Sequence, residues 1–282
     1  MESMSCLFRR LLAAALLSAT MPAASAAGAD AADPFAVDAV AYLVEVNGQP
    51  RWQRNADTRL PPASLTKLMT ALLVLEDGDT ARVVTVSRAA AREGGTRIGL
   101  RAGERYKAAD LLAAMLVASA NDACAALADG GDPHAFVQRM NRRAAALGLA
   151  ATHFRNACGF DAPGHLSTAR ELAVIARAAL RFPEFARIVA LPRVSLRAEG
   201  SRRALSAAST NALIGNYAPA VGIKTGYTAN AGPCLVALGR QHGTDVLLVM
   251  LKARNRWWDA VGLFEQGFRT TQHEEAGDDG TR

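Results

Sequence analysis

The sequence predicts an α/β fold in which a mostly antiparallel sheet is covered by helices and a helical lobe is inserted between its strands. Two observations support this prediction. Segments with the residue pattern of strands lie near both ends of the chain, at 39–54 and 220–252, whereas the segment from about 87 to 190 has mostly helical periodicity. A sheet assembled from two distant segments, with the intervening helices packed on it, accommodates this order.

The first residues have the features of a secretory signal peptide. A basic pair at 9–10 precedes the apolar run 11–19, and Ala-Ser-Ala at 24–26 resembles a cleavage site. The apolar run is too short to span a bilayer as a stable anchor, which disfavours the alternative of a retained membrane segment. We therefore expect residues 1–26 to be removed on export, and a single domain to follow at 27–270.

The N-terminal part of this domain contains a predicted hairpin followed by a helix. The apolar segment 39–46, "AVAYLVEV", is followed by Asn47-Gly48 and then by "QPRWQRN", which is the pattern of two strands joined by a two-residue turn. A helical segment, "PASLTKLMTALL", begins at Pro62, and "ARVVTVS" from Ala81 is a candidate for a short strand. A helix is therefore expected directly after the first two strands.

Helices dominate the middle of the chain, the predicted lobe at about 87–190. The segment 108–118, "AADLLAAMLVA", is apolar at helical spacing. A second helix is predicted between Pro133 and Gly148, because helix starts favour proline and helix ends favour glycine. A third is predicted after Thr168, since Thr and Glu three residues apart are typical of a capping box.

Strands return near the C-terminus. Three apolar segments, at 220–228, 232–240 and 245–252, are separated by turn residues and are predicted to form adjacent strands. An amphipathic helix is predicted at 256–268, "RWWDAVGLFEQGF". The polar segment 271–282 is predicted to be a disordered tail.

A serine and a lysine lie three residues apart on the first predicted helix. Of the 32 Lys and Arg residues only four are lysines, and one of them, Lys67, follows Ser64 at this spacing. Residues three apart on a helix share a face. Burial and nearby positive charge can hold a lysine amine neutral, and a neutral amine can take the proton of a serine hydroxyl. The pair is therefore a candidate nucleophile and base.

Two further motifs follow in the chain. Ser119-Ala120-Asn121 interrupts an apolar helical stretch, which indicates either a turn between helices or polar groups that face a cleft. Lys224-Thr225-Gly226 lies on a predicted strand and contains a second of the four lysines. The order SxxK, SxN and KTG is the motif set of active-site-serine enzymes that react with penicillin.

These motifs, together with "PASLTKLMTALLVLE", "SANDACAALA", "GHLSTARELA" and "VGIKTGYTANAGPCLVA", resemble the penicillin-binding serine DD-peptidases. Within that family the chain is similar to the low-molecular-mass D-alanyl-D-alanine carboxypeptidases and their endopeptidase relatives, from about residue 39 to residue 268. The resemblance implies a β-lactamase/transpeptidase-like fold. It also implies an acyl-enzyme mechanism.

The resemblance assigns four residues to the chemical steps. Ser64 would be the acylated nucleophile and Lys67 its proton acceptor. Ser119 would pass a proton to the leaving amine, and Asn121 would hold Lys67 and the substrate amide.

The resemblance assigns other residues to substrate binding. Lys224 and Thr225 would meet the terminal carboxylate, and Gly226 would let the substrate backbone lie against the strand. The backbone N–H groups of Ser64 and Tyr227 would form the oxyanion hole.

Arg256 matches the place where relatives carry a carboxylate-binding arginine. The alternative is an arginine at a helix start that is exposed to solvent. Three departures, Ala120 for Gly, Val221 for Asp and Cys158 within a usual Thr-Gly-Leu stretch, leave the substrate preference open.

The predicted function is that of a penicillin-sensitive D-Ala-D-Ala carboxypeptidase acting on peptidoglycan stem peptides, with a DD-endopeptidase as the alternative. A β-lactamase is disfavoured, because no Glu-x-x-Leu-Asn string occurs between SxN and KTG. A non-catalytic peptidoglycan-binding protein has no need of both Ser64 and Lys67. Many carboxypeptidases continue into a β-rich domain and a membrane helix, so the end of this chain soon after Phe268 predicts a soluble periplasmic form without a stable membrane anchor, as in the endopeptidases.

No cofactor, metal or nucleic acid is expected. The five histidines have no ligand spacing such as HExxH, and the net charge of +6 includes no Lys/Arg-rich run with interleaved aromatic residues. After loss of the leader three cysteines remain, Cys124, Cys158 and Cys234, which allow at most one internal disulfide. The apolar contexts of Cys124 and Cys234 favour buried small hydrophobic residues over a bridge.

Overall fold

The computed structural model describes residues 35, 37–129 and 132–278. The chain divides into two units, Met1–Asp30 and Ala31–Arg282, and all the described residues belong to the second. The predicted signal peptide at 1–26 lies outside the described residues, so its cleavage stays a prediction.

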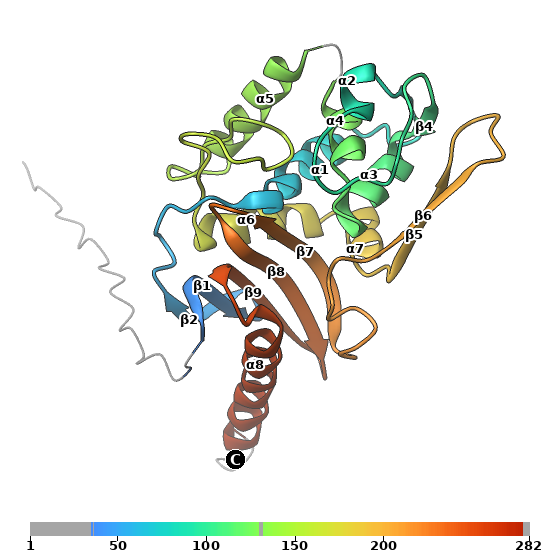
Figure 1. The fold of residues 1–282 in the computed structure, drawn as a ribbon. Coiled ribbons are helices and arrows are strands. Elements are labelled where there is room, and N and C mark those ends of the chain that lie inside the picture. Colours follow the sequence, from blue (N-terminus) through green and yellow to red (C-terminus); the bar gives the residue numbers. More distant parts are fainter. Residues whose placement is uncertain (1–34, 36, 130–131, 279–282) are drawn as a thin grey trace, which may run out of the picture. The chain divides into compact units, whose positions relative to one another are not determined.

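A five-stranded antiparallel sheet is the centre of the described unit (Figure 1). Its strand order is β2-β1-β9-β8-β7, and every neighbouring pair is antiparallel. The strands are β1 (Ala39–Val46), β2 (Gln49–Arg54), β7 (Ala220–Thr228), β8 (Gly232–Gln241) and β9 (Thr244–Ala253). The first and last strands of the chain pair directly, with Tyr42 opposite Met250. The predicted assembly of one sheet from both ends of the chain is confirmed.

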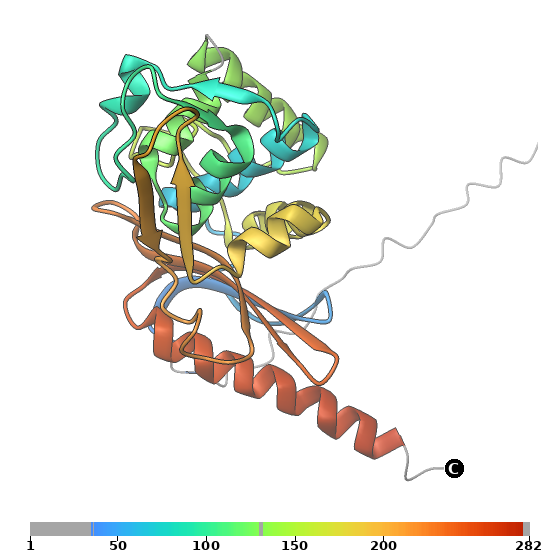
Figure 2. The same cartoon turned by 90° about the vertical axis from the view of Figure 1, so that its right-hand side faces the viewer.

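The segment between β2 and β7 contains the helical lobe and two small two-stranded sheets, β3-β4 and β5-β6. Its elements are η1 (Ala63–Thr66), α1 (Lys67–Glu76), β3 (Val83–Thr85), α2 (Arg88–Ala91), β4 (Arg105–Lys107), α3 (Ala108–Val117), α4 (Asn121–Asp129), α5 (Pro133–Ala146), α6 (Ala169–Leu180), α7 (Pro183–Val189), β5 (Arg193–Arg197) and β6 (Ala204–Ala208). In Figure 2 this helical layer lies on one side of the sheet, and the C-terminal helix α8 (Arg256–Asp278) lies on the other.

The sheet is buried on both faces because its strands send alternate side chains to two cores. On β9, Leu247, Val249 and Leu251 belong to the cluster shared with the helical lobe. The residues between them, Leu248 and Met250, belong to the smaller cluster against α8. A strand that is buried on both faces needs a nearly continuous apolar sequence, which explains the run "DVLLVMLK".

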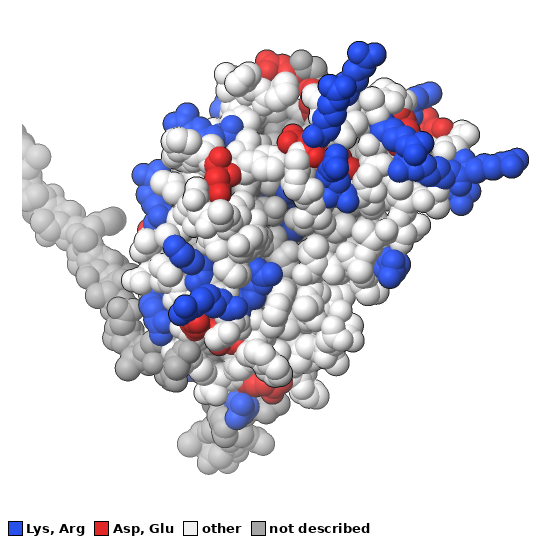
Figure 3. Space-filling model, in the orientation of Figure 1, with Lys and Arg blue, Asp and Glu red and all other residues white. Residues whose placement is uncertain are grey.

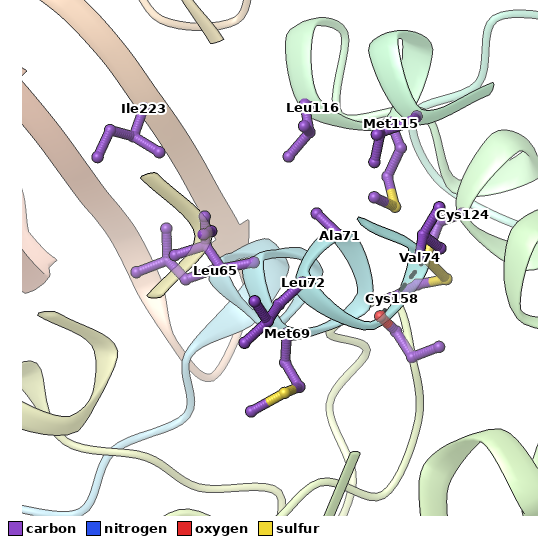
Figure 4. Packing of buried hydrophobic residues seen from close by; sticks show 14 of the residues in the cluster. Leu65, Met69, Ala71, Leu72, Val74, Met115, Leu116, Cys124, Cys158 and Ile223 are labelled. Carbon is purple, nitrogen blue, oxygen red and sulfur yellow. Dashed lines mark hydrogen bonds between the residues drawn. A yellow bond between two sulfur atoms is a disulfide. The ribbon is translucent and has the colours of Figure 1, made fainter. Parts of the chain in front are cut away.

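Helix α1 runs through the centre of the larger core. All its residues from Lys67 to Leu75 are buried, so this helix is apolar around most of its circumference. Figure 4 shows Met69, Ala71, Leu72 and Val74 of α1 among side chains from the surrounding elements. A lysine at the first position of such a helix is therefore removed from bulk solvent by the packing around it.

Local signals in the sequence account for several helix ends. The Asp132 side chain accepts a hydrogen bond from the His134 N–H at the start of α5, and the Thr168 hydroxyl accepts one from the Glu171 N–H at the start of α6. The Glu171 carboxylate does not complete the predicted capping box but binds the Ala151 N–H and the Thr152 hydroxyl. The prediction of a disordered tail at 271–282 is wrong for its first residues, because α8 continues past residue 270 to Asp278.

Candidate active site

The serine and lysine of the first motif are in contact at the start of α1. Ser64 lies in the turn η1 and Lys67 is the first residue of α1, with 2.9 Å between the Lys67 Nζ and Ser64 Oγ atoms. The turn is closely covered by Gly159, where an added Cβ atom would stand 2.0 Å from the carbonyl oxygen of Ala63. Only glycine, which also adopts the φ of +89° found here, permits this approach.

The Lys67 amine has three uncharged acceptors. It donates to the Ser64 hydroxyl at 2.9 Å, to the Asn121 side-chain oxygen at 2.8 Å and to the Cys158 carbonyl oxygen at 2.6 Å. Burial, only partly opposed by the charge of Glu93, lowers the pKa of Lys67 to about 7. A large fraction of this amine is therefore neutral near pH 7 and able to accept a proton.

The second motif, Ser119-Ala120-Asn121, is both a turn between helices and part of the site, so both interpretations of its sequence apply. Ser119 has a left-handed φ of 58° between α3 and α4, and Asn121 begins α4. The Asn121 side-chain oxygen accepts from Lys67, while its amide nitrogen donates to the Gly94 carbonyl oxygen at 2.7 Å. These two partners fix the orientation of the amide.

The third motif lies on the edge strand β7. The Lys224 Nζ atom donates to the Ser119 hydroxyl and to the Thr225 carbonyl oxygen, both at 2.8 Å. Burial, together with the charges of Lys67 and Arg256, holds the pKa of Lys224 well below its usual range. The predicted residues Ser119 and Lys224, which are far apart in sequence, are thus brought into contact.

The Thr225 hydroxyl is oriented by a second threonine, Thr210, at 2.7 Å between the two oxygen atoms. A Cβ atom at Gly226 would lie 3.1 Å from the Ala63 Cβ atom and 3.2 Å from the Ser64 nitrogen, so glycine lets β7 pass close to Ser64. The Tyr227 side chain, which follows, is 68% exposed. The backbone at Gly226 therefore lies next to Ser64, and Tyr227, whose N–H group belongs to the predicted oxyanion hole, follows it directly.

Arg256 is held by the sheet and is not the exposed residue of the alternative interpretation. Its Nη1 atom donates to the carbonyl oxygens of Gly226 at 3.0 Å and Cys234 at 3.3 Å. Its guanidinium lies over the Trp257 ring, 4.6 Å from the ring centre, and burial lowers its pKa. Arg256 thus contacts the backbone of the KTG strand from the first turn of α8.

The prediction for Cys124 is wrong, because Cys124 forms a disulfide with Cys158, with 5.9 Å between their Cα atoms. Cys124 lies one turn after Asn121 on α4, and Cys158 lies on the loop that supplies an acceptor to Lys67. The bridge depends on this tertiary approach of segments 34 residues apart, which the local apolar sequence does not reveal. Cys234 is a buried free thiol, as predicted.

Four contributors to the site were missed in the sequence. The Cys158 carbonyl and the close approach of Gly159 belong to the segment that the sequence marks only as a departure from the family. Thr210, in "SAASTNALIG", and Glu93, in "AREGGTR", have no local pattern that distinguishes them from surface polar residues. Their roles follow from distances between segments, which a single sequence does not contain.

Two features relevant to cofactors and membranes are absent from the described residues. No group of three or more His, Cys, Asp and Glu side chains in residues 35, 37–129 and 132–278 is arranged to hold a metal ion. Within the same ranges no helix combines the length and the apolar character that crossing a membrane requires. On the face of the molecule drawn in Figure 3, basic side chains are interspersed with acidic ones.

Comparison with known proteins agrees with the motifs. Residues 29–255 match the Peptidase S11 family, described as D-alanyl-D-alanine carboxypeptidase. The chain belongs to this family. The predicted family, its fold class and the assignment to the peptidases are confirmed.

Individual relatives show how similar the chain is to known proteins. It is 34% identical over 221 residues to the D-alanyl-D-alanine carboxypeptidase DacF of Bacillus subtilis, which covers 76% of this chain but 57% of the relative. It is 31% identical over 261 residues to a D-alanyl-D-alanine endopeptidase of Pseudomonas aeruginosa, covering 90% of this chain and 83% of that one. The solved Streptomyces K15 DD-transpeptidase has a TM-score of 0.76 and 28% identity, over 83% of this chain and 98% of the other.

Proposed function

We propose that this chain is a penicillin-sensitive serine D-alanyl-D-alanine carboxypeptidase that acts on peptidoglycan stem peptides through an acyl-enzyme on Ser64. One observation carries the proposal: the hydroxyl of Ser64 is hydrogen-bonded to a buried lysine whose pKa is lowered to about 7. Membership of the S11 family supports the same substrate class.

The contacts support a sequence of proton transfers. Neutral Lys67 takes the proton of Ser64 as the oxygen attacks the carbonyl carbon of the D-Ala-D-Ala bond. The developing oxyanion is stabilised by the backbone N–H groups of Ser64 and Tyr227. A proton then passes through Ser119 to the leaving D-alanine amine, and Lys224 keeps the Ser119 hydroxyl in place. Water hydrolyses the acyl-enzyme, and no cofactor takes part.

The edge strand supplies recognition of the terminal carboxylate. Lys224 and the Thr225 hydroxyl provide a cation and a donor at the place where β7 passes Ser64. Charge-assisted hydrogen bonds of this kind are roughly twice as strong as neutral ones. Arg256 adds positive potential and fixes the Gly226 carbonyl, so its contribution to carboxylate binding is through the strand and through its charge.

The proposed place of action is the periplasm. The leader at 1–26 supports export, and the substrate class lies in the cell envelope. Cell fractionation tests this, with a processed protein that remains soluble after a high-salt wash as the expected result. Recovery of the protein in the washed membrane fraction is the opposite result.

Two measurements test the activity. A fluorescent penicillin is expected to label the purified protein covalently, and Ser64→Ala is expected to abolish the label; a label that persists in this variant contradicts the assignment. Mass spectrometry of products from purified pentapeptide muropeptides is expected to show loss of one D-alanine per stem.

The alternative is a DD-endopeptidase, supported by similarity to the Pseudomonas aeruginosa endopeptidase over most of both chains. Both activities use the same acyl-enzyme, and they differ in the amine that leaves. Incubation with cross-linked muropeptide dimers separates them. Cleavage of dimers to monomers at a rate equal to or above that of D-alanine release favours the endopeptidase.

A further inference from the structure

Two of the three acceptors of the Lys67 amine belong to segments that are joined by the disulfide. Asn121 and Cys124 lie one turn apart on α4, and Cys158 is both the partner of Cys124 and the residue whose carbonyl accepts from Lys67. A closed ring of contacts therefore runs from Asn121 to the Lys67 amine, on to Cys158, and through the S–S bond back to Cys124 on the helix of Asn121. Figure 4 shows the two cysteines beside the buried side chains of α1.

The loop that contains Cys158 is otherwise held by hydrogen bonds. The Asn156 side-chain oxygen accepts the N–H groups of Cys158, Gly159 and Phe160. One turn along α1 from Lys67, the Thr70 hydroxyl donates to the Ala157 carbonyl oxygen at 2.6 Å. The disulfide is the covalent tether among these contacts, and it connects the loop to the helix that presents Asn121.

The same loop separates the amine from open space. Cys158 lines a pocket of about 210 Å³, which is bordered also by residues of α2, α4 and α5. On its other side the Cys158 carbonyl contacts Lys67 at 2.6 Å. A pocket of this size has room for water. Movement of the loop therefore brings water towards the amine from the pocket side.

We propose that the Cys124–Cys158 disulfide is a positioning element for Lys67: it holds the Asn121 and Cys158 acceptors on the amine and keeps the loop closed against water. The proposal rests on the function proposed above, in which Lys67 is the base. It assigns a role in the reaction to two residues that do not touch the substrate.

The charges around Lys67 give the expected direction of the effect. Glu93, two residues after the end of α2, raises the pKa of Lys67. The nearby cations are Lys224 on β7 and Arg256 on α8. Lys224 and Arg256 lie on elements that the disulfide does not join, whereas Glu93 lines the same pocket as Cys158. Burial is the main cause of the lowered pKa of Lys67, so removal of the bridge is expected to raise that pKa towards its ordinary value.

Direct titration of the lysine tests the proposal without using activity. The chain has four lysines, so 13C-labelled lysine gives few NMR signals, and Lys67→Arg identifies the one from Lys67. In the parent this signal is expected to titrate near pH 7. In the double variant Cys124→Ala/Cys158→Ala it is expected to titrate about one pH unit higher. An unchanged titration overturns the proposal.

Acylation by a fluorescent penicillin gives the functional readout. If the pKa rises by about one unit, the neutral fraction of Lys67, and with it the rate, falls about fivefold at pH 7 and is within about twofold of the parent at pH 10. A loss that is equal at all pH values overturns the proposal. A parent that is not acylated at all contradicts the proposed function, while the NMR titration still decides the role of the disulfide.

Two controls separate positioning from loss of stability. Phe268→Leu removes packing in the cluster on the α8 face of the sheet, and it is expected to lower the melting temperature without moving the Lys67 titration. Should the double variant not fold, a phosphine reduces the bridge in the parent instead. The disulfide then gains two electrons and two protons to become two thiols, while the phosphine takes an oxygen from water. The reduced parent is expected to show the raised titration, and an unshifted signal overturns the proposal.

Discussion

The two buried lysines of the site differ in their surroundings although both donate to the SxN motif, Lys67 to Asn121 and Lys224 to Ser119. Lys67 is at the start of a buried helix, its acceptors are a hydroxyl, an amide and a peptide carbonyl, and Glu93 is the charge that acts on it. Lys224 is on an edge strand, and the charges that act on it are two cations, Lys67 and Arg256. Burial lowers the pKa of both.

This difference indicates how a single site can use one lysine as a base and a second lysine as a cation. In the free protein, repulsion between Lys67 and Lys224 disfavours a proton on both amines at once. A substrate carboxylate beside Lys224 stabilises the charge on that residue. The charge on Lys224 then lowers the pKa of Lys67 further. In the proposed mechanism, substrate binding thereby divides the two roles between Lys67 on the helix α1 and Lys224 on the strand β7.

The largest expected effect is that of Lys67→Arg. Arginine keeps the positive charge but does not lose its proton, so it is unable to accept the proton of Ser64. Acylation by penicillin at pH 7 is expected to fall by about 10²–10⁴-fold, the range typical for loss of a general base. Lys107→Arg, at an exposed lysine, is the matched control. A rate for Lys67→Arg within a few-fold of the parent means that charge alone suffices on the helix side.

Next in size is Lys224→Ala, measured on a D-Ala-D-Ala peptide and on its C-terminal amide. Hydrogen bonds to charged groups contribute about 1.5–3 kcal/mol, so acylation by the free acid is expected to fall by about 10–100-fold. The amide lacks the carboxylate and is expected to lose less. If the parent already acylates the amide as fast as the acid, or if both substrates lose equally, Lys224 does not recognise the carboxylate.

A smaller effect is expected at the threonine pair on the strand side. Thr210→Val removes the partner of the Thr225 hydroxyl, which is 2.7 Å away. One neutral hydrogen bond contributes about 1 kcal/mol, so the acylation rate is expected to fall about three- to tenfold, and Thr225→Val to cost at least as much. Thr210→Ser keeps a hydroxyl and is expected to retain most of the rate. Equal losses in the Ser and Val variants contradict a role for this hydrogen bond.

The sequence predicted the fold wherever a local pattern carries the information. The turn at Asn47-Gly48, proline and glycine at the ends of α5 and the apolar runs of β8 and β9 are visible in short windows, and each is confirmed. The hairpin of β5 (Arg193–Arg197) and β6 (Ala204–Ala208) was missed, because its strands are short and half-exposed, and β6 consists only of alanine, leucine and serine. Hairpins of this kind depend on what they pack against more than on their own composition.

For the site, the sequence predicted the motif residues but not the contacts that tune them. Ser64, Lys67, Asn121 and Lys224 are visible as motifs because the chemistry requires those side chains at fixed spacing. The acceptor from Cys158 is a backbone carbonyl and has no residue signature. Its bridge to Cys124 spans 34 residues. Such features arise when distant segments meet, and no short window of the sequence contains them.

A still smaller change in rate is expected from the carboxylate that acts on Lys67, that of Glu93. The charge of Glu93 raises the pKa of Lys67, in opposition to burial, so Glu93→Gln is expected to lower that pKa below about 7. More of the amine is then neutral in acid. The acidic limb of the acylation rate is expected to move down by a fraction of a pH unit, so that at pH 6 the variant reacts about two- to threefold faster than the parent, while at pH 9 the two rates coincide. This shift is opposite in sign to the one expected for loss of the disulfide, since removal of a nearby negative charge and admission of water move a lysine pKa in opposite directions. A profile that moves up, or a rate that falls equally at every pH, shows that Glu93 acts on the structure of the lobe and not on the charge of the helix-side lysine.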